Sequence, residues 1–265
     1  MDYNQHTVII TGASSGIGAS FARALAARGA NLVLVARRLD RLQSLAEELR
    51  DAHGIVVHAV QLDLAAPQPA TALRDALVAA GIRPTALINN AGFGTFGTFL
   101  AEDPARLAEE IAVDVSAPVQ LSSEFLPDLV AGKGFLINVA SMAAYAPTPR
   151  MAVYGAAKAF VLSFTESLWA ELRGTGVTAF ALSPGATSSE FNDVVGTEDA
   201  TAGVRKRTPD EVVATALRHL ESRNPGPSVV DGGGNRVGAV VARVLPRRAT
   251  ASAMLRVTDP SRRAR

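Results

Sequence analysis

The sequence predicts an α/β protein: a doubly wound, Rossmann-like parallel sheet of about seven strands with helices on both faces. Two observations support this prediction. Short apolar runs alternate with longer segments whose apolar residues recur every three or four positions. The short runs are apolar throughout, as is typical of parallel strands that are covered on both faces. Alternation of such strands with helices implies right-handed crossovers, and hence this architecture.

The strands are assigned in chain order from short runs rich in Val, Ile, Leu and Phe. The first of these runs is Val8-Ile9-Ile10. The Gly and Pro clusters between runs are short, so they mark turns and not a linker between domains. The predicted strands are residues 7–10, 32–35, 55–60, 86–88, 135–139, 177–182 and 228–230.

The helices are assigned from apolar residues that share one face. Ile17, Phe21 and Leu25, for example, are each four positions apart. The last predicted helix also has a predicted start, with Thr208 as N-cap, Pro at the first helical position and Glu211 completing a capping box. The predicted helices are residues 16–28, 39–52, 70–80, 102–130, 152–173 and 209–222.

Composition excludes several classes of protein. The chain has 265 residues, of which 48% are hydrophobic and 19% charged, so it can bury a sizeable core and is not a disordered polymer. It has no cysteine, which excludes disulfides, thiolate metal sites, iron–sulfur clusters and a cysteine nucleophile. Its four histidines lack ligand spacing, so we expect no metal. The formal net charge of +1 gives no reason to expect nucleic acid.

No targeting segment is recognisable in the sequence. Residues 1–6 are polar and lead directly into an apolar run, which is unlike a signal peptide. No apolar stretch approaches the roughly 18 residues of a membrane-spanning helix. We therefore expect a cytoplasmic protein without an integral membrane segment.

A glycine-rich turn joins the first strand to the first helix. Its three glycines permit a tight turn and a close backbone approach to an anion, and the helix start adds unpaired N–H groups. The spacing differs from the G-x-G-x-x-G fingerprint, and no Lys follows as in a Walker A loop, so turn chemistry alone stays an alternative. The candidate phosphate-binding residues are Gly12, Ser14, Ser15, Gly16, Ile17 and Gly18.

Two arginines, Arg37 and Arg38, follow the second strand. A carboxylate at this place, roughly 20 residues after the glycines, usually binds the free ribose 2′-OH of NAD. Guanidinium groups suit a 2′-phosphate instead, so we favour NADP(H) over NAD(H), unless both arginines merely solvate a helix start. After the third strand, Asp63 either accepts from an adenine amino group or forms a turn, and Leu64 follows it.

Five motifs then occur together in one order. They are Thr-Gly-x-x-x-Gly-x-Gly at 11–18, Asn-Asn-Ala-Gly at 89–92, Ser at 141, Tyr-x-x-x-Lys at 154–158 and Pro-Gly at 184–185. Their order and spacing resemble the short-chain dehydrogenase/reductase (SDR) family, in its single-domain form of about 250 residues, over about residues 5–190. The resemblance implies an oxidoreductase that uses NAD(P)(H) and acts on a carbonyl or an alcohol.

The resemblance also implies contacts with the cofactor. The segment after the fourth strand, with Asn90, Ala91 and Gly92, is expected on the adenosine side. The segment after the sixth strand, with Pro184, Gly185 and Thr187, is expected at the nicotinamide carboxamide.

The residues at the chemical end support this chemistry. Tyr154 and Lys158 are four apart and share one face of a helix. A free phenol has a pKa of about 10, and a nearby ammonium together with a positive oxidised nicotinamide would lower it. Ser141 follows the fifth strand, where ligands collect. We therefore predict that Tyr154 exchanges the proton, Ser141 orients and polarises the carbonyl, and Lys158 tunes Tyr154 and binds ribose.

One position departs from the family pattern. Family members usually have an Asn in the helix before the fifth strand, where it holds a water for proton relay, and the matching residue here is Asp114. Asp accepts from such a water but cannot donate as Asn does, and its charge beside Lys158 would oppose the tuning of Tyr154. We place Asp114 in the catalytic site and leave its part in the relay open.

An apolar lining is expected around the substrate. It would come from Phe93, Phe96, Ala143, Ala144, Tyr145, Pro147 and Phe191, with no fixed cation for an acidic substrate. This favours a small or medium apolar aldehyde, ketone or alcohol. The same aromatic residues could equally be core or oligomer contacts.

The chain is divided into one NADP-binding catalytic domain, residues 1–235, and a C-terminal extension, residues 236–265. The domain includes a substrate loop at about 186–208, where the pattern is weakest. The extension carries eight Arg and one acid, and Val237, Val240, Val241, Val244 and Leu245 could form an apolar helical face. It either contacts a membrane surface or a partner, or packs on the body and ends in a solvated tail.

Two functions stay open. One is an active NADP(H)-dependent enzyme on a small-molecule carbonyl or alcohol, assembled as a homodimer or homotetramer through long helices such as 102–130 and 152–173, as the resemblance implies. The other is a non-catalytic dinucleotide-binding sensor or scaffold of the same fold. The intact Ser141, Tyr154 and Lys158 favour the enzyme, and Asp114 is the departure that favours the sensor.

Overall fold

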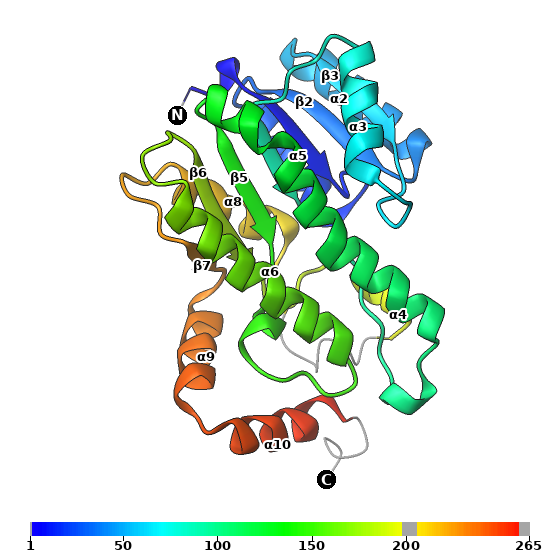
Figure 1. Ribbon diagram of the computed structural model, residues 1–265, viewed down its shortest axis with the longest axis vertical. Helices are drawn as coiled ribbons and strands as arrows, with labels where there is room; N and C mark the ends of the chain where they lie inside the picture. Colours follow the sequence, from blue (N-terminus) through cyan, green and yellow to red (C-terminus); the bar gives the residue numbers. More distant parts are fainter. Residues whose placement is uncertain (1, 198–205, 260–265) are drawn as a thin grey trace.

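The computed structural model describes residues 2–197 and 206–259. Part of the predicted substrate loop and the end of the predicted extension lie outside these residues. Within them the chain forms one seven-stranded sheet with helices on both faces (Figure 1). The predicted fold class is confirmed.

All neighbouring strands pair in parallel, in the order β3-β2-β1-β4-β5-β6-β7. The chain order reverses between β1 and β4, and the crevice at the carboxyl ends of such strands is the usual ligand site of an open parallel sheet. Each predicted strand is present, with ends that differ by at most two residues. The strands are β1 (Thr7–Thr11), β2 (Asn31–Ala36), β3 (Val57–Gln61), β4 (Ala86–Asn89), β5 (Phe135–Val139), β6 (Thr178–Ser183) and β7 (Ser228–Val230).

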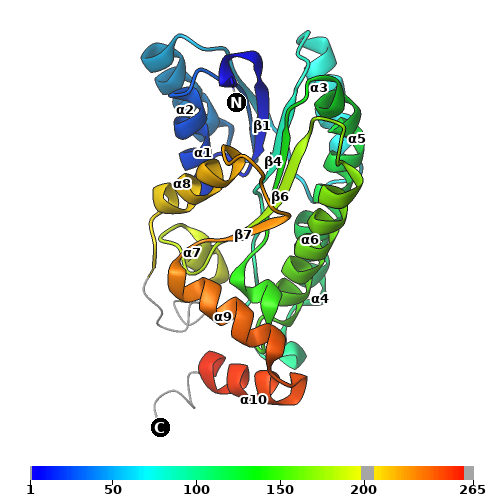
Figure 2. The same ribbon diagram turned by 90° about the vertical axis from the view of Figure 1, so that its left-hand side faces the viewer.

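The helices form two layers, which Figure 2 shows on opposite sides of the sheet. One layer contains α1 (Gly16–Ala26), α2 (Leu39–His53) and α8 (Pro209–Leu220). The other contains α3 (Pro69–Ala79), α5 (Ala117–Ala131) and α6 (Ala152–Glu171). The remaining helical elements are η1 (Tyr3–Gln5), η2 (Phe99–Ala101), α4 (Pro104–Ile111), η3 (Ala112–Ser116), η4 (Met142–Tyr145), α7 (Phe191–Val195), α9 (Gly233–Val244) and α10 (Arg247–Thr258).

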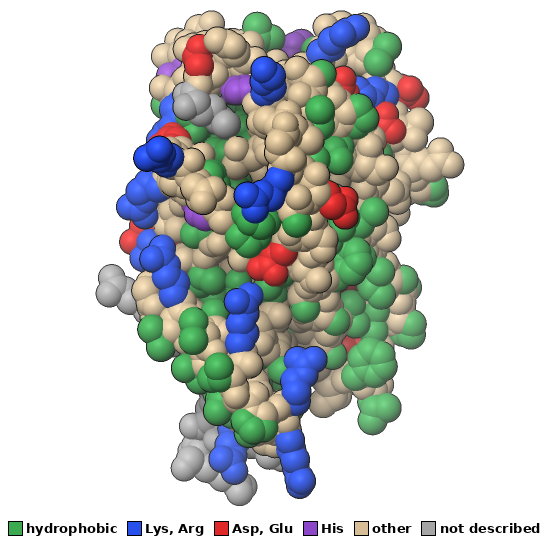
Figure 3. All heavy atoms as spheres, turned by 60° about the vertical axis from the view of Figure 1, so that its left-hand side comes forward, with side chains coloured by type: hydrophobic (Ala, Val, Ile, Leu, Met, Phe, Trp, Pro, Cys, Tyr) green, Lys and Arg blue, Asp and Glu red, His purple; other side chains and the backbone are tan. Residues whose placement is uncertain are grey.

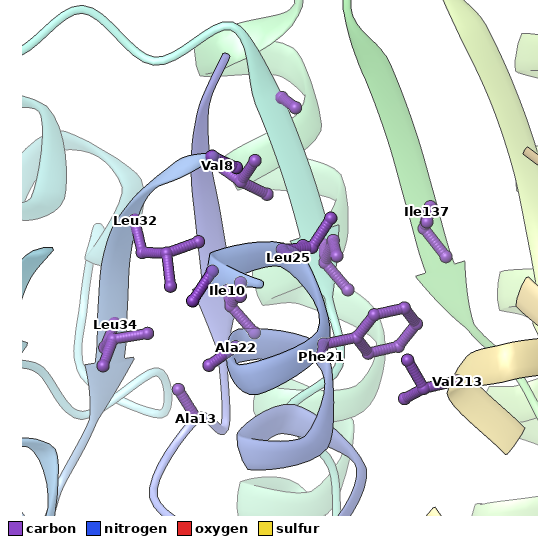
Figure 4. Close-up of a cluster of buried hydrophobic side chains, with 14 of the residues drawn as sticks. Val8, Ile10, Ala13, Phe21, Ala22, Leu25, Leu32, Leu34, Ile137 and Val213 are labelled. Atoms are coloured by element: carbon purple, nitrogen blue, oxygen red, sulfur yellow. The ribbon is translucent and has the colours of Figure 1, made fainter. Parts of the chain in front are cut away.

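A buried apolar cluster fixes the position of α1. Phe21, Ala22 and Leu25 are fully buried against the strands, and Phe21 also approaches Val213 of α8 (Figure 4). Burying a side chain of this size stabilises the fold by roughly 1.5–3 kcal/mol. This packing holds the start of α1 at the carboxyl ends of the strands.

Residues 104–131 are helical, close to the predicted 102–130, but the segment is not α-helical throughout. α4 begins after Asp103, whose side chain accepts a hydrogen bond from the N–H of Ala105, and a π-helical turn, η3, separates α4 from α5. In η3 the N–H of Ala117 donates to the carbonyl of Ala112, five residues back. Pro118 has no N–H with which to make the next α-helical bond. Apolar periodicity does not register such a local widening of a helix.

The predicted start of α8 is confirmed. The Thr208 hydroxyl accepts from the N–H of Glu211 at 3.2 Å, and the Glu211 carboxylate accepts from the N–H of Thr208 at 2.9 Å. This capping box begins the helix at Pro209.

The C-terminal helices lie beyond the carboxyl edge of the sheet (Figure 1). α9 has the predicted apolar face, but that face points outward: Val237 is 64% and Val244 75% exposed. The opposite face carries small residues, including the buried Ala239, and packs toward η4. Small side chains let this face of α9 approach η4 closely, so the valine face is the one that is exposed to solvent. Among residues 2–197 and 206–259, no helix has both the length and the hydropathy needed to cross a membrane.

Candidate active site

A cavity of about 670 Å³ opens at the carboxyl ends of the strands. It extends from the turn after β1, past the ends of β2 and β4, to the turns after β5 and β6 and to α9 and α10. All of the predicted site residues line it except Gly18 and Asp114, which contact the lining from behind. The predicted residues are therefore brought together by the fold.

At its glycines, the turn after β1 leaves little room for a side chain. Gly12 and Gly16 have φ angles of +66° and +53°, a region that favours glycine. A Cβ at Gly18 would lie 2.3 Å from the carbonyl oxygen of Gly12. Ser15 is the N-cap of α1 but its side chain makes no capping hydrogen bond, so the helix start is available to an anion.

Asn90 braces this turn from the end of β4. Its side-chain nitrogen donates to the carbonyl of Thr11 at 2.8 Å, and its own N–H donates to the Thr11 hydroxyl at 3.0 Å. Asp63 and Leu64 line the cavity after β3, where the Asp63 carboxylate accepts from the N–H of Ala65 at 3.0 Å. These two segments line the same cavity.

The side chains of the two arginines after β2 contact different parts of the structure. Arg38 donates to the hydroxyls of Ser14 at 2.9 Å and Ser15 at 3.0 Å, which places its guanidinium at the glycine-rich turn. The Arg37 side chain is 61% exposed and lies 3.6 Å from the carboxylate of Glu109 on α4. Of the two, Arg38 is the group that is fixed beside the phosphate turn.

Glu190, which the sequence did not single out, lies between β6 and α7. Its carboxylate is 2.8 Å from Arg38 and 2.5 Å from Arg41. Hydrogen bonds from Arg41 and Arg38 lower the pKa of Glu190 to about 2. Ser189 lies against Gly16, because a Cβ there would be 3.0 Å from that of Ser189. The segment after β6 is thus tied across the phosphate turn.

Tyr154 and Lys158 lie one turn apart on α6, and the Lys158 ammonium is 5.5 Å from the centre of the Tyr154 ring. Ser141 follows β5, and its hydroxyl accepts from the N–H of Ala143 at 3.1 Å. The hydroxyl hydrogen of Ser141 can therefore still be donated to another acceptor. This arrangement can protonate and polarise an oxygen atom bound in the cavity.

Asp114 lies behind this group, fully buried in η3. One carboxylate oxygen is 3.0 Å from the Lys158 ammonium, and the other accepts from the N–H of Phe93 at 3.0 Å. A Cβ at Gly92 would be 2.9 Å from the Lys158 ammonium and 3.0 Å from the Asp114 carboxylate, so a larger residue there would push on this ion pair. Asp114 therefore binds both the active-site cation and the loop after β4.

The electrostatics of this cluster differ from the sequence prediction. Burial raises the pKa of Tyr154, and the charge of Asp114 adds to this effect, while Lys158 opposes it without reversing it. The predicted lowering is therefore absent in the chain alone. Burial also raises the pKa of Asp114 against the pull of Lys158. Burial disfavours the Lys158 ammonium most strongly, but the charge and hydrogen bond of Asp114 together with the charge of Tyr154 raise the pKa of Lys158 overall.

The segment after β6 forms the opposite wall. The carbonyl of Pro184 accepts from the N–H of Met142 at 2.8 Å, and the Thr187 hydroxyl donates to the Gly185 carbonyl at 3.1 Å. Asn235 in the first turn of α9 packs on Gly185, where a Cβ would be 2.3 Å from its side-chain nitrogen. Sequence reasoning missed Asn235, and the adjacent glycines give no signal of it, since a Cβ at Gly233 or Gly234 would meet nothing within 4 Å.

The substrate end of the cavity is apolar. Phe93, Ala143, Tyr145 and Phe191 line it as predicted, whereas Phe96, Ala144 and Pro147 do not. Residues that the sequence analysis did not assign to it include Met142, Met151, Met254 and Val257. Among the described lining residues the cations are Arg37, Arg38 and Lys158, so no further cation is available for an acidic substrate.

Among the described residues, no arrangement of side chains suits a metal ion. In the part of the chain that the structure describes, no group of three or more His, Asp or Glu side chains is placed to hold a metal ion.

Known proteins match this chain along most of its length. The family model for short chain dehydrogenases matches residues 6–200. A short chain dehydrogenase of Pseudocercospora fijiensis is 34% identical over 217 residues, which covers 80% of this chain and 65% of that protein. A sulfoacetaldehyde reductase of Chromohalobacter salexigens is 38% identical over 192 residues, which covers 69% of this chain and 73% of the relative.

Solved structures agree. A short-chain dehydrogenase from Sphingobium yanoikuyae in complex with NADPH matches with a TM-score of 0.80 and 35% identity, covering 89% of this chain and 92% of that one. An SDR from Burkholderia phymatum in complex with NAD matches with a TM-score of 0.79 and 25% identity, covering 91% and 93%. With the motifs gathered in one cavity and the family model matching 6–200, the chain belongs to the short chain dehydrogenase family, the SDR oxidoreductases that act on CH–OH groups with NAD(P).

Proposed function

We propose that this SDR oxidoreductase is an active NADP(H)-dependent enzyme that interconverts a carbonyl and an alcohol. The observation that carries the proposal is the meeting of Ser141, Tyr154 and Lys158 in one cavity that continues to Arg38 at the phosphate turn. When bound, the cofactor supplies or accepts a hydride at its nicotinamide ring.

The residues of the chain manage the oxygen and its proton. Ser141 donates a hydrogen bond to the substrate oxygen and polarises the carbonyl. Tyr154 gives its proton to that oxygen during reduction and takes it back during oxidation. Lys158 stands within 5.5 Å of the Tyr154 ring and stabilises the phenolate, besides donating to ribose hydroxyls. Asp114 holds Lys158 in place through the 3.0 Å ion pair.

NADP(H) is proposed over NAD(H) because of Arg38. Its guanidinium is fixed by two serine hydroxyls beside the glycine-rich turn, and a 2′-phosphate suits such a fork of donors. Solved relatives with NADPH and with NAD both exist, so the preference rests on this chain's own arginine.

An uncharged, largely apolar carbonyl compound is the proposed substrate. Phe93, Met151, Phe191 and Met254 line the cavity, and no cation is placed among them to bind an acid. The relative that reduces sulfoacetaldehyde acts, by its name, on an anion. We infer that this chain has a different substrate.

Self-association is proposed through the long helices. Ile111 is 45% and Phe160 42% exposed, and Phe160 stacks on Phe164 at 5.8 Å. Removing such apolar surface from water favours a dimer or tetramer. A cytoplasmic location stays a prediction.

The test is a panel of apolar aldehydes and ketones, with NADPH oxidation followed by absorbance and Tyr154→Phe as the control. We expect at least one compound to be reduced, and Tyr154→Phe to lose about 100-fold or more in kcat because the proton donor is gone, with NADPH binding retained. Equal rates for both proteins on every compound would favour the non-catalytic sensor instead.

A further inference from the structure

Glu110 is a carboxylic acid that the fold buries completely. It lies on α4, four residues before Asp114, and is 0% exposed. Among the described residues, neither of its carboxyl oxygens has a partner in hydrogen-bond geometry. Thr95, on the loop after β4, is near enough to favour the charged form slightly.

The residues around Glu110 carry more negative than positive charge. Asp114 and Glu102 are the charged groups that act on it most, and both are acids. The cation of the cluster is Lys158, which is already paired with Asp114 at 3.0 Å. On the same helix, Arg106 pairs with Glu109 at 2.5 Å. Two buried carboxyls therefore share one ammonium, and an uncompensated buried charge is costly.

Neighbouring carboxyls in such a site separate in pKa, because ionisation of one disfavours ionisation of the other. Asp114 has the cation and a backbone N–H, so it is the one that stays ionised. Burial, and then the charge of Asp114, raise the pKa of Glu110 to about 7. Below that pH Glu110 holds a proton, and above it the proton passes to solvent water.

We propose that Glu110 is a positioning residue for the reaction: a second buried acid which, once ionised, acts with Asp114 and against Lys158, so that Tyr154 holds its proton more tightly. The inference rests on the proposed role of Tyr154. The negative charges of Glu110 and Asp114 both raise the pKa of Tyr154. Carbonyl reduction needs a protonated Tyr154, whereas alcohol oxidation needs the phenolate, so ionised Glu110 favours reduction.

The first experiment measures Tyr154 directly, without turnover. The chain has three tyrosines, so the near-ultraviolet absorbance of phenolate can be titrated, and the difference from Tyr154→Phe isolates Tyr154. We expect Glu110→Gln to lower the Tyr154 midpoint by on the order of one pH unit, the effect of removing one nearby buried charge. Glu110→Asp, which keeps the charge, should restore most of the parent midpoint.

Matched controls separate charge from structure. Glu109→Gln removes an acid from the next position on α4, outside the buried cluster, and should leave the Tyr154 midpoint unchanged. Glu110→Met is a second neutral variant and should shift the midpoint in the same direction as Glu110→Gln. A Tyr154 midpoint that is the same in the parent and in both neutral variants would overturn the inference.

The second experiment uses the pH profile of kcat/KM. In Glu110→Gln the alkaline fall of carbonyl reduction and the acid fall of alcohol oxidation should both move to lower pH, by the shift seen in the absorbance titration. If no compound is turned over, the proposed function fails, but the absorbance titration still decides the role of Glu110. If turnover is present and neither the profile nor the titration shifts, only this inference fails.

Discussion

At the scale of single residues, two acids that lie outside the five sequence motifs, Asp114 and Glu110, influence the charge of Lys158. Lys158 is paired with Asp114, and Glu110 lies one turn further back, with no hydrogen-bond partner for its carboxyl oxygens in the described part of the chain. Asp114 also holds the loop after β4 through the N–H of Phe93. A single Asp in place of Asn thus couples the charge of the site to the position of its neighbouring loop.

We expect Asp114→Asn to keep or raise turnover. The substitution removes a negative charge that raises the pKa of Tyr154, and it leaves one oxygen to accept from either Phe93 or Lys158. Steady-state kcat for carbonyl reduction and alcohol oxidation is the measurement, with oxidation expected to gain more because it needs the phenolate. A fall to below about one-hundredth of the parent rate would show that Asp114 has a role that Asn cannot fill.

The two arginines after β2 should differ in their effect on cofactor binding. Arg38→Leu removes the guanidinium at the phosphate turn, and we expect the Kd for NADPH to rise about 10- to 100-fold, as for loss of a charge-assisted hydrogen-bonded pair. Arg37→Leu is the matched control and should have a smaller effect, because Arg37 points toward Glu109. Fluorescence titration with NADPH and NADH checks this, and a similar loss for both cofactors would contradict the assignment.

At the scale of elements, two irregular segments hold residues of the cavity in place from outside the sheet. The π turn η3 places Asp114 against α6, and the segment after β6 lies over the phosphate turn through Ser189 and Glu190. Neither follows a regular period, because each is shaped by contacts with another element. The chemistry is therefore positioned by interruptions of the regular fold as much as by the fold itself.

Glu190→Gln should tighten NADPH binding. The carboxylate of Glu190 occupies Arg38 at 2.8 Å and places a negative charge beside the proposed phosphate site. Its removal should lower the Kd for NADPH about two- to fivefold, the range of an exposed ion pair, and less at high salt. NADH serves as the internal control and should bind as before. Weaker NADPH binding would show that Glu190 instead helps to hold Arg38 beside the glycine-rich turn.

The same ion pair predicts a dependence of stability on pH. The pKa of Glu190 falls from an ordinary value of 4.5 to about 2 in the folded chain. A carboxyl with a lowered pKa stabilises the fold above its unfolded value, and this contribution is lost as the pH falls from 4.5 toward 2. Urea unfolding at neutral pH and at pH 3 should therefore show a smaller acid loss in Glu190→Gln than in the parent.

At the scale of the whole molecule, the two C-terminal helices form part of the cavity wall. Met254 and Val257 of α10 line it, and Asp259, the one acid of the last 30 residues, pairs with Arg150 at 3.1 Å. The outer face of α9 is different: hydrophobic and basic side chains are mixed over the lower part of the view in Figure 3. The extension thus has an inner side that contributes to the cavity and an outer side that is left to solvent.

We expect Met254→Ala to raise KM for an apolar substrate about five- to tenfold, because it removes apolar contact worth roughly 0.8 kcal/mol per buried methylene. NADPH binding should not change, since Met254 is on a different part of the cavity from Arg38. Val244→Ala, on the 75% exposed outer face of α9, is the matched control and should leave KM as it is. Equal KM values for the parent and Met254→Ala would place the substrate elsewhere in the cavity.

The sequence by itself determined the architecture, because strand runs and helical periodicity are local patterns that each segment carries in its own residues. It also indicated the glycine-rich turn, the capping box at Thr208 and the Tyr154–Lys158 pair, since these depend on spacings of a few residues. Apolar periodicity did not reveal η3, where a π turn lies within an otherwise α-helical segment.

Only the tertiary structure decided the electrostatics and the far wall of the site. Glu110, Glu190, Asn235 and Met254 reach the site, or the residues that form it, from segments distant in sequence, and nothing in their local sequence indicates what they meet. The pKa of Tyr154 rises because burial and Asp114 outweigh Lys158, which no spacing reveals. Burial and charge proximity are properties of three-dimensional neighbours, and so they appear only once the chain is folded.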